Sequence, residues 1–149
     1  MRRHPNTYEL HCLCGGGPIR AVDPWLTKVA DFNLDVYAEI LALVDAIRRF
    51  GRELTDPESH PVVTSKFDMH ALRRTPPSNT APFADSPPVI RILYAFCRNE
   101  LGTHVAVVLL GGDKTDLGNR WYPPNIAEAE RRLLIYGGQK QLKPMRRQR

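Results

Sequence analysis

Three basic side chains in the second half of the chain stand beside apolar runs, where an unpaired charge is costly. Arg91 interrupts the otherwise apolar run from Ile90 to Phe96, Arg73 follows a shorter apolar stretch, and Lys114 comes just after a glycine pair that ends another run. Charges in such places require a partner of opposite sign. Phosphate suits all three, because arginine donates two parallel hydrogen bonds to it and lysine adds a positive point charge.

The alternation of side chains along a strand predicts that the two arginines share one face of a sheet. If the even-numbered apolar residues of both strands face the helices, Arg73 and Arg91 face away, on an uncovered face. Lys114 would lie near the rim of that face. A parity shifted by one residue would put Arg74 there in place of Arg73. Three cations on one surface repel one another unless they share an anion.

The sheet itself is predicted from apolar patterns. Strands are expected at residues 7–13, 62–67, 69–74, 90–96 and 105–110. The first is a candidate edge strand, the second and third could be one bent strand or two short ones, and the last two form a hairpin. Residues 75–88 contain five prolines and predict a long loop without periodicity.

Two segments before the main strands carry helical signals. Residues 24–29 form the first, with Asp23 as a candidate N-cap. The clearer helix spans residues 34–50, with Asn33 as its cap and Gly51 as its end. Apolar positions at spacings of three and four predict one buried stripe on it, made up of Leu34, Tyr37, Leu41, Val44 and Ile47.

A last helix is predicted from near Pro124, where Asn125 and Glu128 have the spacing of a capping box, and it stops at Gly137. The order of elements predicts an α+β domain. An N-terminal helical hairpin packs on one face of a mainly antiparallel sheet, and a C-terminal helix follows. We expect a single domain over residues 1–136 and a flexible basic tail over residues 137–149.

Composition limits the classes of protein to consider. The chain has 149 residues and a net charge of +5, and seven basic but no acidic residues lie between residues 131 and 149. This tail could attract nucleic acid, although a solvated terminus is the more ordinary interpretation. No apolar run approaches the length of a membrane span, and no signal peptide is apparent. Three cysteines, an odd number, favour a reducing compartment, so we expect the cytoplasm.

A His-Cys-Leu-Cys run beginning at His11 invites a metal interpretation. A structural zinc site needs a second pair of ligands, and only Cys97 and scattered histidines remain. Ordinary thiols are therefore favoured, and we expect neither a metal site nor a cofactor. His70 is left out of the candidate site, because strand alternation places it on the face opposite Arg73.

A series of short motifs points to a known family. They are Trp25-Leu26, Phe50-Gly51, Leu54 before Pro57, Leu72-Arg73, Val89 to Phe96, Leu110 to Thr115, Arg120-Trp121-Tyr122 and Ile126 to Glu130. As a set they resemble the RelE/ParE superfamily of toxins, closest to its phage-derived, HigB-like branch. The resemblance spans about residues 20 to 134. It implies a small fold in which a helical hairpin packs on a mainly antiparallel sheet.

The resemblance also implies an activity. Toxins of the RelE and HigB branches are ribosome-dependent endoribonucleases (mRNA interferases) that cut messenger RNA without a metal, and the resemblance implies the same activity for this chain. The ribose 2′-hydroxyl attacks the adjacent phosphate and leaves a 2′,3′-cyclic phosphate and a 5′-hydroxyl. By position, Arg73 and Arg91 would grip that phosphate, and Lys114 would stabilise charge or assist proton transfer. Three further residues would contact the RNA, the aromatic rings by stacking: Arg120, Trp121 and Tyr122.

The expected partners follow from the same family. A cognate helix-turn-helix antitoxin would bind the toxin, and promoter DNA would be bound only through that complex. The ribosome and messenger RNA would be the targets, and no membrane is involved. Two alternatives stay open: a non-catalytic, ParE-like inhibitor of DNA gyrase and an inactive phage-derived binding module. Departures from the family pattern leave room for them, among them the proline-rich loop, Cys97 in place of an acid-proline turn, and the basic tail.

Each candidate residue also has an ordinary structural interpretation. Lys114 could be a solvated lysine at a strand end, and a base role would require its pKa to fall. Arg91 could form an ion pair with Asp113 or Asp116. Trp121 could belong to the core instead of stacking on a base.

Overall fold

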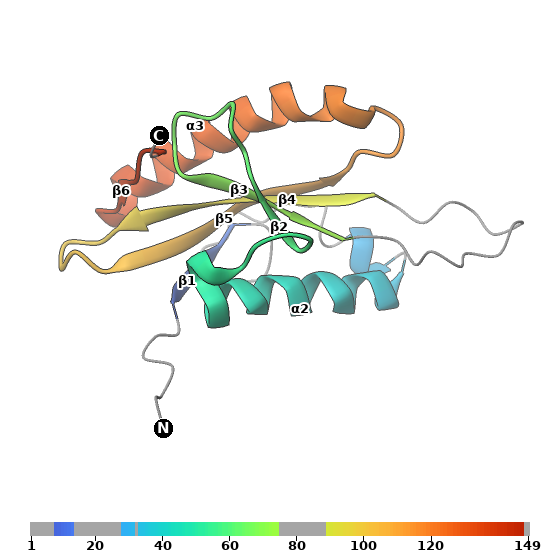
Figure 1. Ribbon diagram of the computed structural model, residues 1–149, viewed down its shortest axis with the longest axis horizontal. Helices are drawn as coiled ribbons and strands as arrows, with labels where there is room; N and C mark the ends of the chain where they lie inside the picture. Colours follow the sequence, from blue (N-terminus) through green and yellow to red (C-terminus); the bar gives the residue numbers. More distant parts are fainter. Residues whose placement is uncertain (1–7, 14–27, 32, 75–88, 148–149) are drawn as a thin grey trace, which may run out of the picture.

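The computed structural model describes residues 8–13, 28–31, 33–74 and 89–147. A twisted sheet lies between two long helices, with α2 against one face and α3 against the other (Figure 1). The helical elements are α2 (Leu34–Phe50), α3 (Tyr122–Lys140) and the short 3-10 turns η1 (Gly51–Glu53) and η2 (Gly118–Trp121). The α+β class is confirmed, and the C-terminal helix packs on the face of the sheet opposite α2.

Six strands of the described chain form the sheet. They are β1 (Glu9–Cys12), β2 (Ser59–Pro61), β3 (Met69–Arg73), β4 (Ile90–Arg98), β5 (His104–Asp113) and β6 (Lys143–Pro144). Their order is β1-β5-β4-β3-β2, and β6 also pairs with β4, next to the start of β3. Only the β1–β5 pair is parallel, so the sheet described here is mainly antiparallel, with the predicted β4–β5 hairpin at its centre.

Side-chain alternation gives the sheet two apolar faces. The even-numbered core residues pack with α2: Leu72, Ile90, Ile92, Tyr94 and Phe96. The odd-numbered ones pack with α3: Met69, Ala71, Leu93, Ala95 and Cys97. The predicted parity of β3 and β4 is confirmed. The face that carries the odd-numbered residues is covered by α3 along part of its length, so the expectation of an uncovered face is wrong.

Helix α2 has the predicted bounds but a different buried stripe. Asn33 caps it by accepting a hydrogen bond from the backbone N–H of Val36 at 3.1 Å, and Gly51 ends it with φ of +53°. The buried side chains are Val36, Ile40 and Ile47, whereas Leu34 and Leu41 are 70% and 44% exposed. Apolar residues lie on more than one side of this helix, so spacing alone could not choose the buried side.

Helix α3 begins earlier and ends later than predicted. It starts at Tyr122, and the Asn125 side chain donates to the carbonyl of Trp121 at 2.7 Å instead of capping the helix. Gly137 lies inside the helix and permits a close approach, since a Cβ there would meet the backbone oxygen of Leu142 at 2.8 Å. The helix ends at Gln141, which adopts φ of +57°.

The segment after α3 returns to the sheet. Leu142 is buried, and β6 pairs with the end of β4. The backbone N–H of Met145 donates to the carbonyl of Phe96 at 3.0 Å, and the backbones of Arg146 and Phe67 form an antiparallel β-bridge. Residues 137–147, where the sequence predicted a tail, thus form the end of α3, the strand β6 and a β-bridge in this structure.

Elements that were predicted from weaker sequence patterns agree less well with the structure. Strand β1 is the expected edge strand, but β2 lies at residues 59–61, and the predicted strand at 62–67 consists mainly of turns. Residues 28–31 are helical, whereas the start of that helix and the loop at 75–88 lie outside the described residues. None of the helices in the described ranges is long and apolar enough to cross a membrane.

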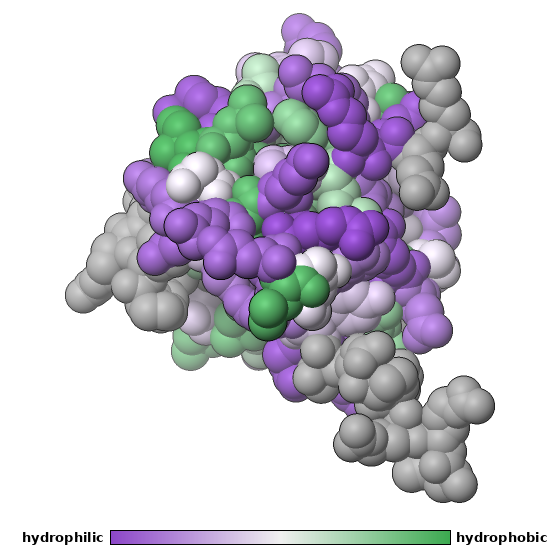
Figure 2. Space-filling model, turned by 90° about the vertical axis from the view of Figure 1, so that its left-hand side faces the viewer, coloured by the Kyte–Doolittle hydropathy of each residue, from purple (hydrophilic) through white to green (hydrophobic). Residues whose placement is uncertain are grey.

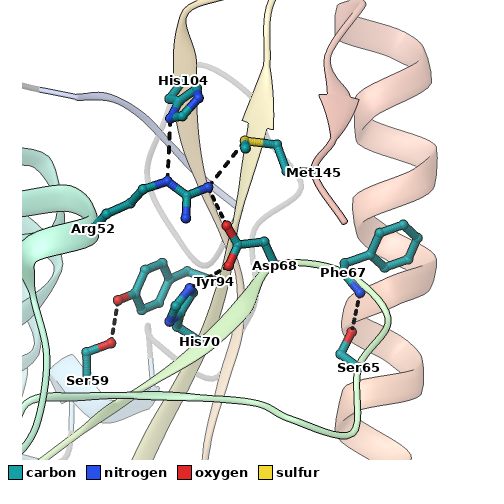
Figure 3. Close-up of polar contacts among 9 residues, drawn as sticks. All are labelled: Arg52, Ser59, Ser65, Phe67, Asp68, His70, Tyr94, His104 and Met145. Carbon is teal, nitrogen blue, oxygen red and sulfur yellow. Dashed lines mark hydrogen bonds and ion pairs between the residues drawn. The ribbon is translucent and has the colours of Figure 1, made fainter. Parts of the chain in front are cut away.

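A polar network joins η1, β3 and the returning C-terminal segment on the α2 side of the sheet (Figure 3). Asp68 accepts a hydrogen bond from His70 Nε2 at 2.8 Å and forms an ion pair with Arg52. Arg52 also donates to His104 Nδ1 at 3.4 Å and to the sulfur of Met145 at 3.3 Å. Burial opposes ionisation of Asp68, but the bond from His70 and the charge of Arg52 hold its pKa below the usual value.

A second polar contact anchors β2. The hydroxyls of Ser59 and Tyr94 are hydrogen-bonded to each other, and both residues are buried. Burial raises the pKa of Tyr94 to about 12, so this phenol is neutral and able to donate. Because Ser59 is held on this face, the next residue along β2 is presented to the opposite face.

Candidate functional site

Cross-strand pairing brings the two arginines of the predicted site side by side. Arg73, at the end of β3, is the direct partner of Arg91 on β4, and Gly112 of β5 is the partner of Arg91 on its other side. Directly opposed residues of antiparallel strands point to the same face, with Cβ atoms about 4.5–5.5 Å apart. Two like charges in this arrangement repel each other, so an anion between them would stabilise the pair.

The two arginines and Lys114 line one cleft of about 360 Å³. Its walls come from β2 and the turn after it, from β3, the start of β4 and the residue after β5, and from η2 and the first turns of α3. Besides the cations, its polar lining includes His60, Asn119 and Tyr122. The predicted convergence of the three cations on one surface is confirmed, in a cleft beside α3.

Arg91 is held by hydrogen bonds rather than by a carboxylate. Its Nε donates to the hydroxyl of Tyr122 at 3.0 Å, and its Nη1 donates to its own strand, at the carbonyl of Ile90, at 2.8 Å. Asp113 instead accepts from the backbone N–H of Val89 and of Thr115. The alternative of an ion pair with Asp113 or Asp116 is not found among the described residues, where Arg91 contacts a hydroxyl and a backbone carbonyl instead.

Lys114 sits where burial and neighbouring charge both act on its ammonium group. Its Nζ donates to Asn119 Oδ1 at 3.1 Å and lies 5.3 Å from the centroid of the Tyr122 ring. Partial burial, and then the charges of Arg91 and Arg73, lower the pKa of Lys114 below its ordinary value. A lysine with a lowered pKa can give up a proton more readily than a solvated one can.

Arg73 and Arg74 take different roles, as the alternation along β3 requires. Arg73 points into the cleft and donates to Asp56 Oδ1 at 3.2 Å. Arg74 is buried on the α2 side, where its Nη2 donates to Glu39 Oε1 at 3.3 Å within an ion pair. Arg73 rather than Arg74 therefore lines the cleft, and Arg74 ties β3 to helix α2.

The three residues predicted to contact RNA lie in different environments. Tyr122 is half-buried and lines the cleft. Trp121 is only 4% exposed and packs in the core, where its Nε1 lies close to Gly112, so its expected role as a stacking surface is wrong for this conformation. Arg120 is exposed on η2 and does not line the cleft. The core alternative for Trp121 is thus the observed one.

Sequence reasoning missed His60, Asn119 and Asp56. The Asp56 carboxylate lies 3.2 Å from Arg73 Nη1 and 3.5 Å from His60 Nδ1, so one acid contacts two residues of the cleft. His60 could be assigned to the cleft only if β2 was located, because the pairing of His60 with Ala71 places its side chain on the cleft face. Because the strand was expected at residues 62–67, this pairing could not be anticipated.

The His-Cys-Leu-Cys run does not assemble ligands in the part of the chain that the structure describes. His11 is hydrogen-bonded to Tyr136 of α3 and to Glu9, and Cys12 is half-buried. No group of three or more histidine, cysteine or acidic side chains that could hold a metal occurs within these ranges. The second cysteine of the run lies outside the described residues.

One curated relative decides the family. “Putative toxin HigB3” of Mycobacterium tuberculosis is 33% identical to this chain over 100 residues, which cover 67% of the chain and 75% of the relative. The chain belongs to the HigB-like toxins of the RelE/ParE superfamily. This HigB-like protein is a toxin of a toxin–antitoxin system, and its partner is an antitoxin. Neither a family model nor a solved structure matches the sequence.

One departure of this HigB-like toxin from its family pattern has a structural explanation. Cys97 replaces an acid-proline turn, and in the structure it lies within β4, fully buried and paired with Pro144 of β6. Strand β4 continues through this position because the returning segment after α3 covers its edge. Burial raises the pKa of the Cys97 thiol to about 12, so the thiol is an apolar core group rather than a nucleophile.

Proposed function

We propose that this HigB-like toxin is a metal-independent endoribonuclease that cuts messenger RNA on translating ribosomes. The observation that carries the proposal is the convergence of Arg73, Arg91 and Lys114 in one cleft. Within the described residues, neither Arg91 nor Lys114 forms an ion pair with a carboxylate. A phosphodiester would supply the missing negative charge.

The chemistry that suits this cleft is an internal attack on phosphorus. The 2′-oxygen of a ribose bonds to the adjacent phosphorus, the bond to the 5′-oxygen breaks, and the products carry a 2′,3′-cyclic phosphate and a 5′-hydroxyl. Negative charge grows on the phosphoryl oxygens during this step. Arg73 and Arg91, paired across β3 and β4, would hold those oxygens from one side.

Lys114 would act at the edge of the same phosphate. Its ammonium group is held by Asn119 and by the ring of Tyr122, so its direction is set by the protein. Partial burial and then the two arginines lower its pKa, and this supports a part in proton transfer as well as in charge stabilisation. Binding of the phosphate would partly offset their repulsion, because an anion would then lie among the three cations.

The surface near the cleft suits a polynucleotide. Lys66 follows the turn that lines the cleft, and its Nζ lies 5.3 Å from the centroid of the Phe67 ring, while the guanidinium of Arg146 lies 5.9 Å from that centroid. Figure 2 shows the end of the molecule away from Arg91, where the β4–β5 hairpin and β6 lie, with hydrophilic side chains over much of its surface. Basic groups beside the cleft would contact neighbouring phosphates along the RNA.

The wider setting follows from the family. We propose that the antitoxin partner carries a helix-turn-helix and that promoter DNA is bound through the toxin–antitoxin complex. The ribosome and messenger RNA would then be reached in the cytoplasm when the antitoxin is removed. The two aromatic positions differ in this proposal, because Tyr122 faces the cleft and Trp121 supports it from the core.

The test is to add the purified toxin to translating ribosomes and to map the RNA ends that appear. We expect new fragments with 5′-hydroxyl ends from the parent and at least about a hundredfold fewer from Arg91→Gln. Arg98→Gln is the matched control, because Arg98 is an exposed arginine at the other end of the same strand. It should cut as the parent does.

Two outcomes would contradict the proposal. One is the absence of new 5′-hydroxyl ends at any toxin concentration that stops growth. The other is full toxicity of Arg91→Gln in cells. Inhibition of DNA supercoiling by purified gyrase, in a parallel assay, would then identify the ParE-like alternative.

A further inference from the structure

A histidine lies in the same cleft as the three cations. His60 is the middle residue of β2, and its partner across the β2–β3 pair is Ala71, whose side chain packs on the α3 side of the sheet. His60 lines the cleft together with Arg73, Arg91 and Lys114, and its side chain is 52% exposed. The imidazole is thus accessible to a ligand that the cations hold.

The backbone around His60 is firmly placed. The preceding residue, Ser59, is buried and hydrogen-bonded to Tyr94 on the opposite face of the sheet. The backbone N–H of Arg73 donates to the carbonyl of Glu58 at 2.8 Å, so β2 is joined directly to the strand that carries the first arginine. The position of the imidazole relative to the cleft is therefore set by the sheet rather than by a loose loop.

A carboxylate lies beside the ring. Asp56 Oδ1 lies 3.5 Å from His60 Nδ1 and 3.2 Å from Arg73 Nη1. A carboxylate at this nitrogen favours the tautomer with the proton on Nδ1, which leaves the lone pair of Nε2 for a ligand. It also stabilises the imidazolium that forms when Nε2 accepts a proton. The other charged groups of the cleft are the cations Arg91 and Lys114, and His70 lies on the far face.

We propose that His60 is the general base of RNA cleavage in this cleft and that Asp56 is its positioning residue. This inference rests on the proposed endoribonuclease function and assigns the proton acceptor that the three cations cannot supply while they are charged. A phosphate held between Arg73 and Arg91 places the neighbouring ribose within the cleft that His60 lines. A base must reach the proton that it removes, directly or through one water.

The protons balance with the groups present. As the 2′-oxygen bonds to phosphorus, its proton moves to His60 Nε2 and produces an imidazolium beside Asp56. As the bond from phosphorus to the 5′-oxygen breaks, that oxygen takes a proton from the ammonium of Lys114. The net change in the RNA is an isomerisation to a 2′,3′-cyclic phosphate and a 5′-hydroxyl. Exchange with water then returns a proton to Lys114 and removes one from His60.

The first experiment compares His60→Gln with the parent on translating ribosomes. We expect cleavage to fall by about 10²–10⁴-fold, while binding to the ribosome changes by less than about twofold. Asp56→Asn should cause a smaller loss than His60→Gln, because it acts through the ring. His104→Gln is the matched control, since His104 lies at the start of β5, outside the lining of the cleft. Thermal melting of each variant establishes that it is folded.

A second experiment separates the base from the acid. Messenger RNA with sulfur in place of the 5′-oxygen at the cleavage site has a leaving group that departs without a proton. We expect this substrate to restore cleavage by Lys114→Gln and not by His60→Gln.

The outcomes distinguish this inference from the function on which it rests. If the parent cuts RNA and His60→Gln cuts it equally well, the base assignment is wrong and the endoribonuclease function stands. If the sulfur substrate restores His60→Gln, the histidine is the acid, and the assignment is again wrong. If the parent produces no cleavage at all, both proposals are overturned.

Discussion

Removal of Asp68 tests the polar network that joins the C-terminal segment to the rest of the fold (Figure 3). The carboxylate is mostly buried, with 14% of the side chain exposed, and it serves both His70 and Arg52. Asp68→Ala would leave His70 and Arg52 without this acceptor. It would also loosen the contact between η1 and the strand that leads into the Arg73 position.

The expected loss follows from the two partners. A hydrogen bond with a charged partner contributes about 1.5–3 kcal/mol, which applies to the 2.8 Å bond from His70. The Arg52 side chain is 35% exposed, so solvent screens its share to under about 1 kcal/mol. The total is about 1.5–4 kcal/mol. For a chain of this length, at about 2–4 °C for each kcal/mol, that loss lowers the Tm by about 3–16 °C.

The sign of the pH dependence follows from the lowered pKa of Asp68. A carboxyl with a folded-state pKa below its unfolded value stabilises the fold above the unfolded pKa, which is about 3.9. This contribution is lost as the pH falls through the folded-state pKa. Stability of the parent should therefore fall more steeply below pH 4 than stability of Asp68→Ala.

The assay is urea or thermal unfolding followed by circular dichroism at several pH values. Asp45→Ala is the matched control, because Asp45 forms an exposed pair with Arg48 at 2.9 Å, in which both side chains are more than 40% exposed. It should change stability by less than about 0.5 kcal/mol. Equal effects of the two substitutions, or an Asp68→Ala curve parallel to the parent's at low pH, would refute the reasoning.

Three further predictions concern the site and its support. Arg91→Gln should raise the pKa of Lys114, because it removes a cation that disfavours the charged ammonium. NMR titration of the lysine side chain measures this change, and an unchanged titration would contradict the proximity of Arg91 and Lys114. Gly112→Ala should cost about 1–3 kcal/mol, since the new Cβ would lie 2.8 Å from Trp121 Nε1, and an unchanged urea midpoint would contradict that packing. Deletion of the segment after α3 should lower the free energy of unfolding by at least about 2 kcal/mol, because it removes the buried side chain of Leu142 and the pairing of β6 with β4. Unaltered melting would contradict this.

The central strands were predictable because their patterns were unambiguous. The β4–β5 hairpin joins two long apolar runs, and tertiary contacts did not need to override local preference there. Alternation then sufficed to place Arg73 and Arg91 on one face. The bounds of α2 were equally clear, because Asn33 and Gly51 mark its ends.

Long-range contacts decided what the sequence could not. Gly137 looked like a helix end, but it continues α3 because the returning chain packs against it. The basic charges after it suggested a solvated tail, yet the segment pairs with β4. Strand β2 has only three residues, and its pairing with β3 is what places His60 in the cleft. Helix α3 packs on β4 and β5, on the face that seemed open, and the pattern of the helix alone did not indicate which face it covers.

The central claim, that three cations form one phosphate site, is tested most directly by NMR of their side chains during titration with a short RNA. The RNA should carry 2′-O-methyl groups so that it cannot be cut. We predict that the signals of Arg73, Arg91 and Lys114 shift together along one binding curve, while Arg98 stays unchanged. Separate curves for the three cations, or an Arg91 signal that does not respond, would contradict the account.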